Sequence, residues 1–134
     1  MNMSRTMIVS AALLVVLTMS AVWAADNTCS ECGMTVDADS RFSSKIAGDG
    51  KALFFCDIGD MFSYLGRKNR NASGAAVRDY GTGEWVAAEK AYYVHSEKKF
   101  KTPMGWGVAA FQDRDRAAGF GKVMDFEAAA EALK

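Results

Sequence analysis

The sequence of 134 residues has little proline, little histidine and no net charge. It contains one proline and one histidine, and its 16 Lys and Arg residues balance 16 Asp and Glu residues. The lack of net positive charge argues against nucleic-acid binding through bulk electrostatics. The single histidine, His95, has no evident nucleophile partner, so we expect that the protein is not an enzyme. Half of the residues are hydrophobic, which is typical of one globular domain.

The N-terminal segment has the layout of a secretory signal peptide. Arg5 supplies a positive charge, and an almost unbroken apolar run follows over residues 7–22, before a small-residue cleavage site. Because this run is shorter than the roughly 18–20 residues of a membrane-spanning helix, cleavage is favoured over anchoring. The residues before Cys29 do not form a lipoprotein box. We therefore expect residues 1–24 to be removed, leaving residues 25–134 as a soluble protein of a bacterial periplasm with no stable membrane insertion.

The hydrophobic pattern predicts an α+β fold with two similar halves, over residues 29–80 and 85–134. Each half has the order strand, strand, helix, strand, and the chain ends in a further helix. Phe55 and Phe111 lie at equivalent strand-to-helix junctions of the two halves, and an aspartate follows each two residues later as a helix cap. Because each half alone would bury too little apolar surface, we predict two fused ββαβ units that share a small core. The expected strands are residues 35–47, 51–56, 75–80, 90–95, 108–111 and 122–124, the linker is 81–84, and the last helix is 127–133.

The candidate site chemistry is concentrated in sulfur. Cys29, Cys32 and Met34 place three sulfur atoms within six residues, and Gly33 gives the backbone the freedom to turn two of them toward one ion. Met104 lies in a loop shaped by a proline and two glycines, where methionine is less common than in a core strand. Thiolate and thioether ligands are soft and prefer Cu(I) over hard cations. The four cysteine and methionine residues are therefore the candidate Cu(I) ligands.

Other interpretations of the cysteines remain open. Cys56, Met61 and His95 are possible secondary ligands, although each also fits an ordinary role in the core or at a strand end. Cys29 and Cys32 could form a disulfide or a redox pair, but no long amphipathic helix follows them, which argues against a thioredoxin-like activity. A zinc site would need four nitrogen or sulfur ligands, which the three cysteines and His95 could supply. The alternatives to copper binding are thus a thiol–disulfide protein and an interaction module with a structural disulfide.

Several sequence blocks resemble the NosL family and cover nearly all of residues 25–134 in order. Each block alone is moderately specific, and together they are strong evidence for the resemblance. The blocks are Cys32-Gly33-Met34, Phe54-Phe55-Cys56-Asp57, Asp79-Tyr80, Glu84-Trp85-Val86-Ala87-Ala88, Lys90-Ala91-Tyr92-Tyr93-Val94 and Thr102-Pro103-Met104-Gly105-Trp106-Gly107-Val108-Ala109-Ala110-Phe111.

The resemblance implies a pair of ββαβ units, similar to a portion of organomercurial lyase. It also implies an exported accessory factor that binds Cu(I) and delivers copper to the copper–sulfide centre of nitrous oxide reductase, the enzyme of a denitrification step. Cys32 and Met34 match the Cys-x-Met element of the family, Met104 matches its Met-Gly loop, and Cys29 adds a CxxC that many relatives share. Many relatives are lipoproteins, whereas this chain has no lipoprotein box before Cys29. The expected function is a periplasmic metallochaperone that receives copper from a donor and passes it to a copper enzyme.

Overall fold

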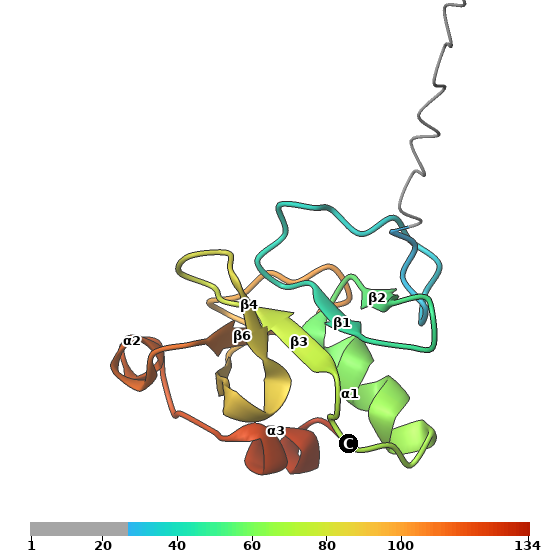
Figure 1. Ribbon diagram of the computed structural model, residues 1–134. Helices are drawn as coiled ribbons and strands as arrows, with labels where there is room; N and C mark the ends of the chain where they lie inside the picture. Colours follow the sequence, from blue (N-terminus) through green and yellow to red (C-terminus); the bar gives the residue numbers. More distant parts are fainter. Residues whose placement is uncertain (1–26) are drawn as a thin grey trace, which may run out of the picture.

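The computed structural model describes residues 27–134, so the predicted signal peptide over residues 1–24 lies outside the described part of the chain. The described chain forms two antiparallel sheets with three α-helices (Figure 1). Within this part, no helix is long and apolar enough to cross a membrane. The elements are β1 (Ser44–Ile46), β2 (Leu53–Phe55), α1 (Ile58–Arg67), β3 (Ala75–Arg78), β4 (Trp85–Ala87), the 3-10 helix η1 (Ala88–Lys90), β5 (Tyr92–His95), β6 (Val108–Phe111), α2 (Arg114–Ala118) and α3 (Phe126–Ala132).

The first unit is a four-stranded sheet packed against helix α1. Its strand order is β2-β1-β3-β4, and all neighbouring strands are antiparallel. Helix α1 begins at Asp57, whose carboxylate accepts a hydrogen bond from the N–H of Gly59 at 3.2 Å. One side of the helix is apolar, so Ile58, Met61 and Leu65 are buried in the core. The Asp57 cap and the apolar side of α1 together fix the position of the β2–α1 junction.

The second unit repeats this order with a shorter helix. β5 pairs with β6, and Met124 adds a single antiparallel bridge to Tyr93. Helix α2 is capped by Asp113, whose carboxylate accepts hydrogen bonds from the N–H groups of Asp115 and Arg116. The predicted α+β fold with a C-terminal helix is confirmed. The strand predicted over residues 122–124 is reduced to the single bridge of Met124.

The short strand β4 is a part of the sheet that the sequence pattern did not predict. It directly follows the predicted linker over residues 81–84 and pairs with β3 in the first sheet. Lys45 and Arg78 place their cationic groups over the ring of Trp85, 4.3 and 4.1 Å from its centroid. These cation–π contacts join β4 to β1 and β3. A three-residue segment is too short for its hydrophobic pattern to identify such a strand.

Asp79 joins the two units. It forms a parallel bridge with Ala110 of β6, and the N–H of Tyr80 donates to the carbonyl of Ala110 at 2.8 Å. The Asp79 carboxylate accepts hydrogen bonds from the N–H of Gln112 at 2.6 Å and the N–H of Thr82 at 2.7 Å. Burial alone would raise the pKa of Asp79, but these N–H donors hold it below its usual value. The residue is therefore an ionised link between the two sheets.

The hydrophobic core divides into two packed clusters. The larger one contains the apolar side of α1 together with residues of both sheets and of α3. Within it, the ring of Phe62 lies 5.4 Å from that of Tyr93 and 5.0 Å from that of Phe126, measured between centroids. The smaller cluster is rich in aromatic rings and includes the contact of Tyr80 with Phe111. The larger cluster draws on both units, as the prediction of a shared core requires.

Candidate metal centre

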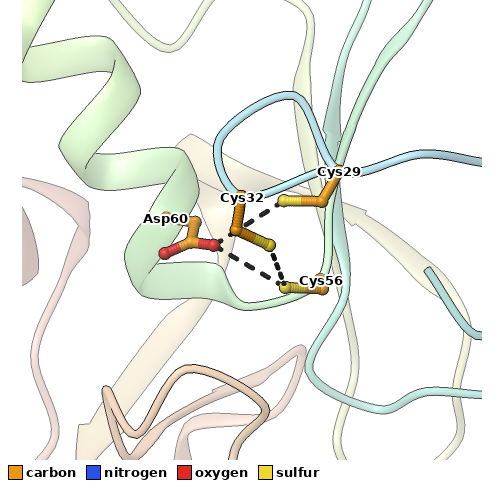
Figure 2. Close-up of side chains that lie close together, drawn as sticks. All are labelled: Cys29, Cys32, Cys56 and Asp60. Atoms are coloured by element: carbon orange, nitrogen blue, oxygen red, sulfur yellow. Dashed lines mark hydrogen bonds between the residues drawn. The ribbon is translucent and has the colours of Figure 1, made fainter. Parts of the chain in front are cut away.

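A tight loop near the start of the described chain carries Cys29 and Cys32. The N–H of Cys29 donates to the carbonyl of Met34 at 2.7 Å, and the N–H of Gly33 donates to the carbonyl of Cys29 at 2.9 Å. Gly33 has a φ of +77°, a left-handed conformation that glycine adopts without strain. The loop is attached to the sheet because Cys29 forms a parallel bridge with Phe54 of β2. This chain reversal turns both cysteines toward the β2–α1 junction (Figure 2).

The β2–α1 junction supplies two further side chains, Cys56 and Asp60. Cys56 directly follows β2, and Asp60 lies four residues later in the first turn of α1. Although Cys56 precedes the helix, its thiol lies 3.6 Å from Oδ2 of Asp60. Asp57 already caps the helix, which leaves the carboxylate of Asp60 available for other contacts. It faces the cysteine loop (Figure 2).

Three sulfur atoms and one carboxylate meet here, and we call Cys29, Cys32, Cys56 and Asp60 the thiol cluster. The Sγ atoms of Cys32 and Cys56 lie 3.5 Å apart. The thiols of Cys29 and Cys56 each lie 3.6 Å from Oδ2 of Asp60, to which they donate. All four ligand atoms lie within 4.8 Å of one another (Figure 2). A cluster of this size and composition could hold one metal ion.

The thiol cluster is shielded from solvent except at Cys32. Cys29 is 2% exposed and Cys56 and Asp60 are 3% exposed, whereas Cys32 is partly exposed. Burial raises the pKa of the Cys56 thiol, and its hydrogen bond with Cys32 raises it further. A thiol must lose its proton to ligate a metal, so metal binding here would release protons. An ion would reach the cluster past Cys32.

The loop between β5 and β6 packs onto the start of α1. The indole Nε1 of Trp106 donates to Oδ1 of Asp60 at 2.9 Å, and the N–H of Met104 donates to Oδ2 of Asp57 at 3.0 Å. Gly59 makes this packing possible, because a Cβ at its position would lie only 2.0 Å from the Trp106 ring. The loop therefore orients the carboxylate of Asp60 and holds the backbone of Met104 beside the β2–α1 junction.

Met34 and Met104 are exposed methionines on segments attached to the thiol cluster. Their side chains are 44% and 45% exposed, which is unusual for large apolar residues. The carbonyl of Met34 accepts from Cys29, and the N–H of Met104 donates to Asp57. Burial in the core therefore does not explain either methionine. Both thioethers are accessible to an ion at the surface.

The remaining predicted ligands divide between the cluster and the core. The structure brings all three cysteines together, including Cys56, for which the sequence also fitted an inert core role. Met61 is fully buried on the apolar side of α1 and serves packing. His95 is exposed at the end of β5 and lies outside the thiol cluster. In the four-ligand set considered for zinc, Asp60 thus takes the place of His95.

Asp60 is a site residue that sequence reasoning missed. Acidic residues in the first turn of a helix are readily explained by capping and by the helix dipole. Two signals could have identified it: Asp57 already fills the cap position, and Asp60 lies only four residues after Cys56. Its contact with Trp106 joins residues 46 positions apart, so local spacing gives no indication of it.

Fold and cluster together define a small α+β protein with a thiol-rich site that could hold a metal ion. The sequence profile of the NosL family matches residues 21–132, and the chain belongs to that family. The crystal structure of the copper chaperone NosL from Shewanella denitrificans has a similar fold, with a TM-score of 0.65 and 20% sequence identity over 77% of this chain and 89% of that chain. A search of curated proteins finds no match. Family membership confirms the resemblance inferred from the sequence and agrees with a binding protein rather than an enzyme.

Proposed function

We propose that this chain is an exported metallochaperone that carries one Cu(I) ion as cargo and passes it to a copper enzyme. The observation that carries the proposal is a cluster of three thiols with two exposed methionines on attached segments. Sulfur ligands in this number suit a soft monovalent cation. Membership of the NosL family and the fold of a copper chaperone support the same conclusion.

The proposed ligands at the surface are Cys32, Met34 and Met104. Cys32 is the thiol of the cluster that solvent reaches, and Met34 is two residues away across the left-handed Gly33. The Met104 loop is attached to the start of α1, which directly follows Cys56. One thiolate neutralises the charge of Cu(I), and two neutral thioethers complete a site of low coordination number. Thioethers bind more weakly than thiolates, so the ion can be released.

The buried thiols give copper a route for ligand exchange. Because the sulfur of Cys56 lies 3.5 Å from that of Cys32, an ion on Cys32 gains a second thiolate with little movement. Cys29 is the third thiol of the same cluster. A sulfur ligand of the recipient replaces a thioether first, and protons return to the buried thiols as the ion leaves. Each step exchanges one sulfur ligand for another, which keeps the ion from being released into solvent.

The proposal extends to compartment and partners. The apolar N-terminal segment over residues 1–24 supports export to the periplasm, where a copper donor would load the chain. The recipient we propose is a periplasmic copper enzyme such as nitrous oxide reductase. Mixing the copper-loaded chain with copper-free reductase should restore reductase activity, and the Cys32→Ser chain treated in the same way should not. Equal restoration by free Cu(I) and by the loaded chain would contradict delivery by the chaperone.

Anaerobic titration of the reduced protein with Cu(I) against a chromogenic chelator tests the copper site. We expect one ion per chain, and Cys32→Ser should weaken binding by at least about tenfold. Met34→Leu and Met104→Leu keep the side-chain volume while removing sulfur, so both should weaken binding. Met124→Leu is the matched control, because it removes a partly buried methionine outside the thiol cluster. Unchanged affinity in Cys32→Ser would overturn the proposal.

A thiol–disulfide role is the competing function, and the close contact of Cys32 with Cys56 favours it. It predicts catalysed reduction of a disulfide substrate and a reduction potential in the range of redox catalysts. We expect the reduced chain to bind Cu(I) and to show no such activity. Catalysis that is lost in Cys32→Ser, together with failure to compete for Cu(I), would favour the redox function instead.

A further inference from the structure

We propose that the thiol cluster is also a four-ligand site for a thiophilic divalent cation such as Zn²⁺, with Asp60 as the ligand that selects it. This site differs in composition from the proposed copper site, and the proposal does not depend on copper binding. The ligand atoms are Sγ of Cys29, Sγ of Cys32, Sγ of Cys56 and Oδ2 of Asp60.

The separations of the ligand atoms fit a tetrahedron around one ion. With Zn–S bonds of about 2.3 Å and a Zn–O bond of about 2.0 Å, tetrahedral angles place two sulfur ligands about 3.8 Å apart and a sulfur and an oxygen about 3.5 Å apart. The sulfur–sulfur distance between Cys32 and Cys56 is 3.5 Å. The sulfur atoms of Cys29 and Cys56 each lie 3.6 Å from Oδ2 of Asp60. Since no separation in the cluster exceeds 4.8 Å, small side-chain rotations are enough to enclose an ion.

Asp60 distinguishes a divalent from a monovalent ion. A carboxylate oxygen is an ordinary Zn²⁺ ligand, whereas Cu(I) prefers sulfur. Its negative charge also favours the higher positive charge of a divalent ion. Asp60 is buried, and Trp106 donates to its Oδ1 at 2.9 Å, so Oδ2 is the oxygen presented to the sulfur atoms (Figure 2). An N–H donor on the distant oxygen is a common way of orienting a ligating carboxylate.

The two ligand sets have Cys32 in common. The thiol cluster uses Cys32 as one of its four ligands, and the proposed copper site uses Cys32 as its thiolate. We therefore expect Zn²⁺ and Cu(I) to compete for the chain. Zinc would hold the cysteine loop closed on the β2–α1 junction, whereas copper would be held nearer the surface with Met34 and Met104.

Anaerobic titration of the reduced protein with Co²⁺, followed by displacement with Zn²⁺, tests the proposal. Tetrahedral Co²⁺ with thiolate ligands absorbs strongly in the visible and near-ultraviolet ranges, and we expect one Co²⁺ per chain. Asp60→Asn should weaken Co²⁺ binding by at least about tenfold while changing Cu(I) affinity little. Asp115→Asn is the matched control, since Asp115 is the acidic residue in the first turn of α2. Met34→Leu and Met104→Leu should bind Co²⁺ as the parent chain does.

The outcomes separate this proposal from the copper proposal. No tetrahedral Co²⁺ spectrum, or Co²⁺ binding by Asp60→Asn as tight as that of the parent chain, would overturn the divalent site while leaving Cu(I) binding untouched. Normal Co²⁺ binding without Cu(I) binding would overturn the copper function alone. X-ray absorption at the zinc edge of the parent chain needs no variant, so it decides the question even if a substitution prevents folding. It should show three sulfur neighbours and one oxygen neighbour.

Discussion

The two strand-to-helix junctions of this protein have the same backbone plan and different chemistry. In each, an aromatic residue ends a strand and an aspartate two residues later caps a helix, at Asp57 in the first unit and Asp113 in the second. Between strand and cap lies Cys56 in the first unit and Gln112 in the second. The fold requires the cap and the buried ring, whereas the residue between them can carry chemistry.

The contrast continues into the first helical turn. Four residues after Cys56 stands Asp60, and four residues after Gln112 stands Arg116. An acid in contact with a thiol at the start of a helix favours a cation, whereas a guanidinium at the matching position disfavours one. The side-chain chemistry of one junction, rather than the repeated fold, thus accounts for the candidate site.

Changing the residue between strand and cap at either junction tests the comparison most strongly, and the largest effect is expected at Cys56. Cys56→Ser should weaken Zn²⁺ binding by at least about tenfold, because it removes one of four proposed ligands. Gln112→Cys should add no second ion, because the second junction has neither a facing cysteine loop nor an acid one turn later. Metal content per chain after gel filtration measures both effects. A second tightly bound ion in Gln112→Cys would show that a lone junction cysteine is sufficient.

Asp79 tests the link between the two units. Asp79→Asn should lower the free energy of unfolding by about 1–3 kcal/mol at neutral pH. Its amide has only one acceptor oxygen, so the N–H of either Gln112 or Thr82 loses its partner. The folded state lowers the pKa of Asp79, so the ionised carboxylate stabilises the fold above the unfolded-state value of about 3.9. That contribution is lost as the pH falls below this value toward the folded-state pKa.

Urea unfolding at neutral and acidic pH measures this prediction. The difference in stability between the parent chain and Asp79→Asn should shrink as the pH falls. Asp113→Asn is the control, because its exposed cap touches only its own helix. An equal difference at both pH values would mean that the charge of Asp79 contributes nothing.

Local patterns predicted the elements of the fold, and chain reversals determined the site. The cap at Asp57 and the apolar spacing after it were enough to identify α1, because both signals lie within one helix. Strand β4 was not identified, since its pairing depends on β3 and on two cations above Trp85. The sulfur-rich loop at Cys29 was visible in the sequence, whereas its meeting with Asp60 depends on the parallel bridge to β2, which no spacing encodes.

Gly59 is the next point at which the junctions differ, because the matching residue in the second unit is Asp115. Gly59→Ala would place a Cβ 2.0 Å from the Trp106 ring and force the loop away, which should cost about 1–3 kcal/mol. It should also weaken Zn²⁺ binding, since Asp60 loses its indole donor. Asp115→Ala lies on an exposed helix turn and should change stability by no more than about 0.5 kcal/mol. Thermal unfolding and tryptophan fluorescence measure both, and an unchanged emission spectrum in Gly59→Ala would contradict displacement of Trp106.

The smallest effect expected is the difference in stability loss between removing the cap at Asp57 and removing the cap at Asp113. Asp113→Ala should cost about 1 kcal/mol, the usual value for a lost N-cap. Asp57→Ala should cost about 1 kcal/mol more, because the buried Asp57 also accepts the N–H of Met104 and leaves that donor unpaired. Urea unfolding of both variants measures this difference in the free energy of unfolding. Equal losses would show that the Met104 loop is held by its other contacts, chiefly the indole of Trp106 on Asp60, and that the first cap has no function beyond that of the second.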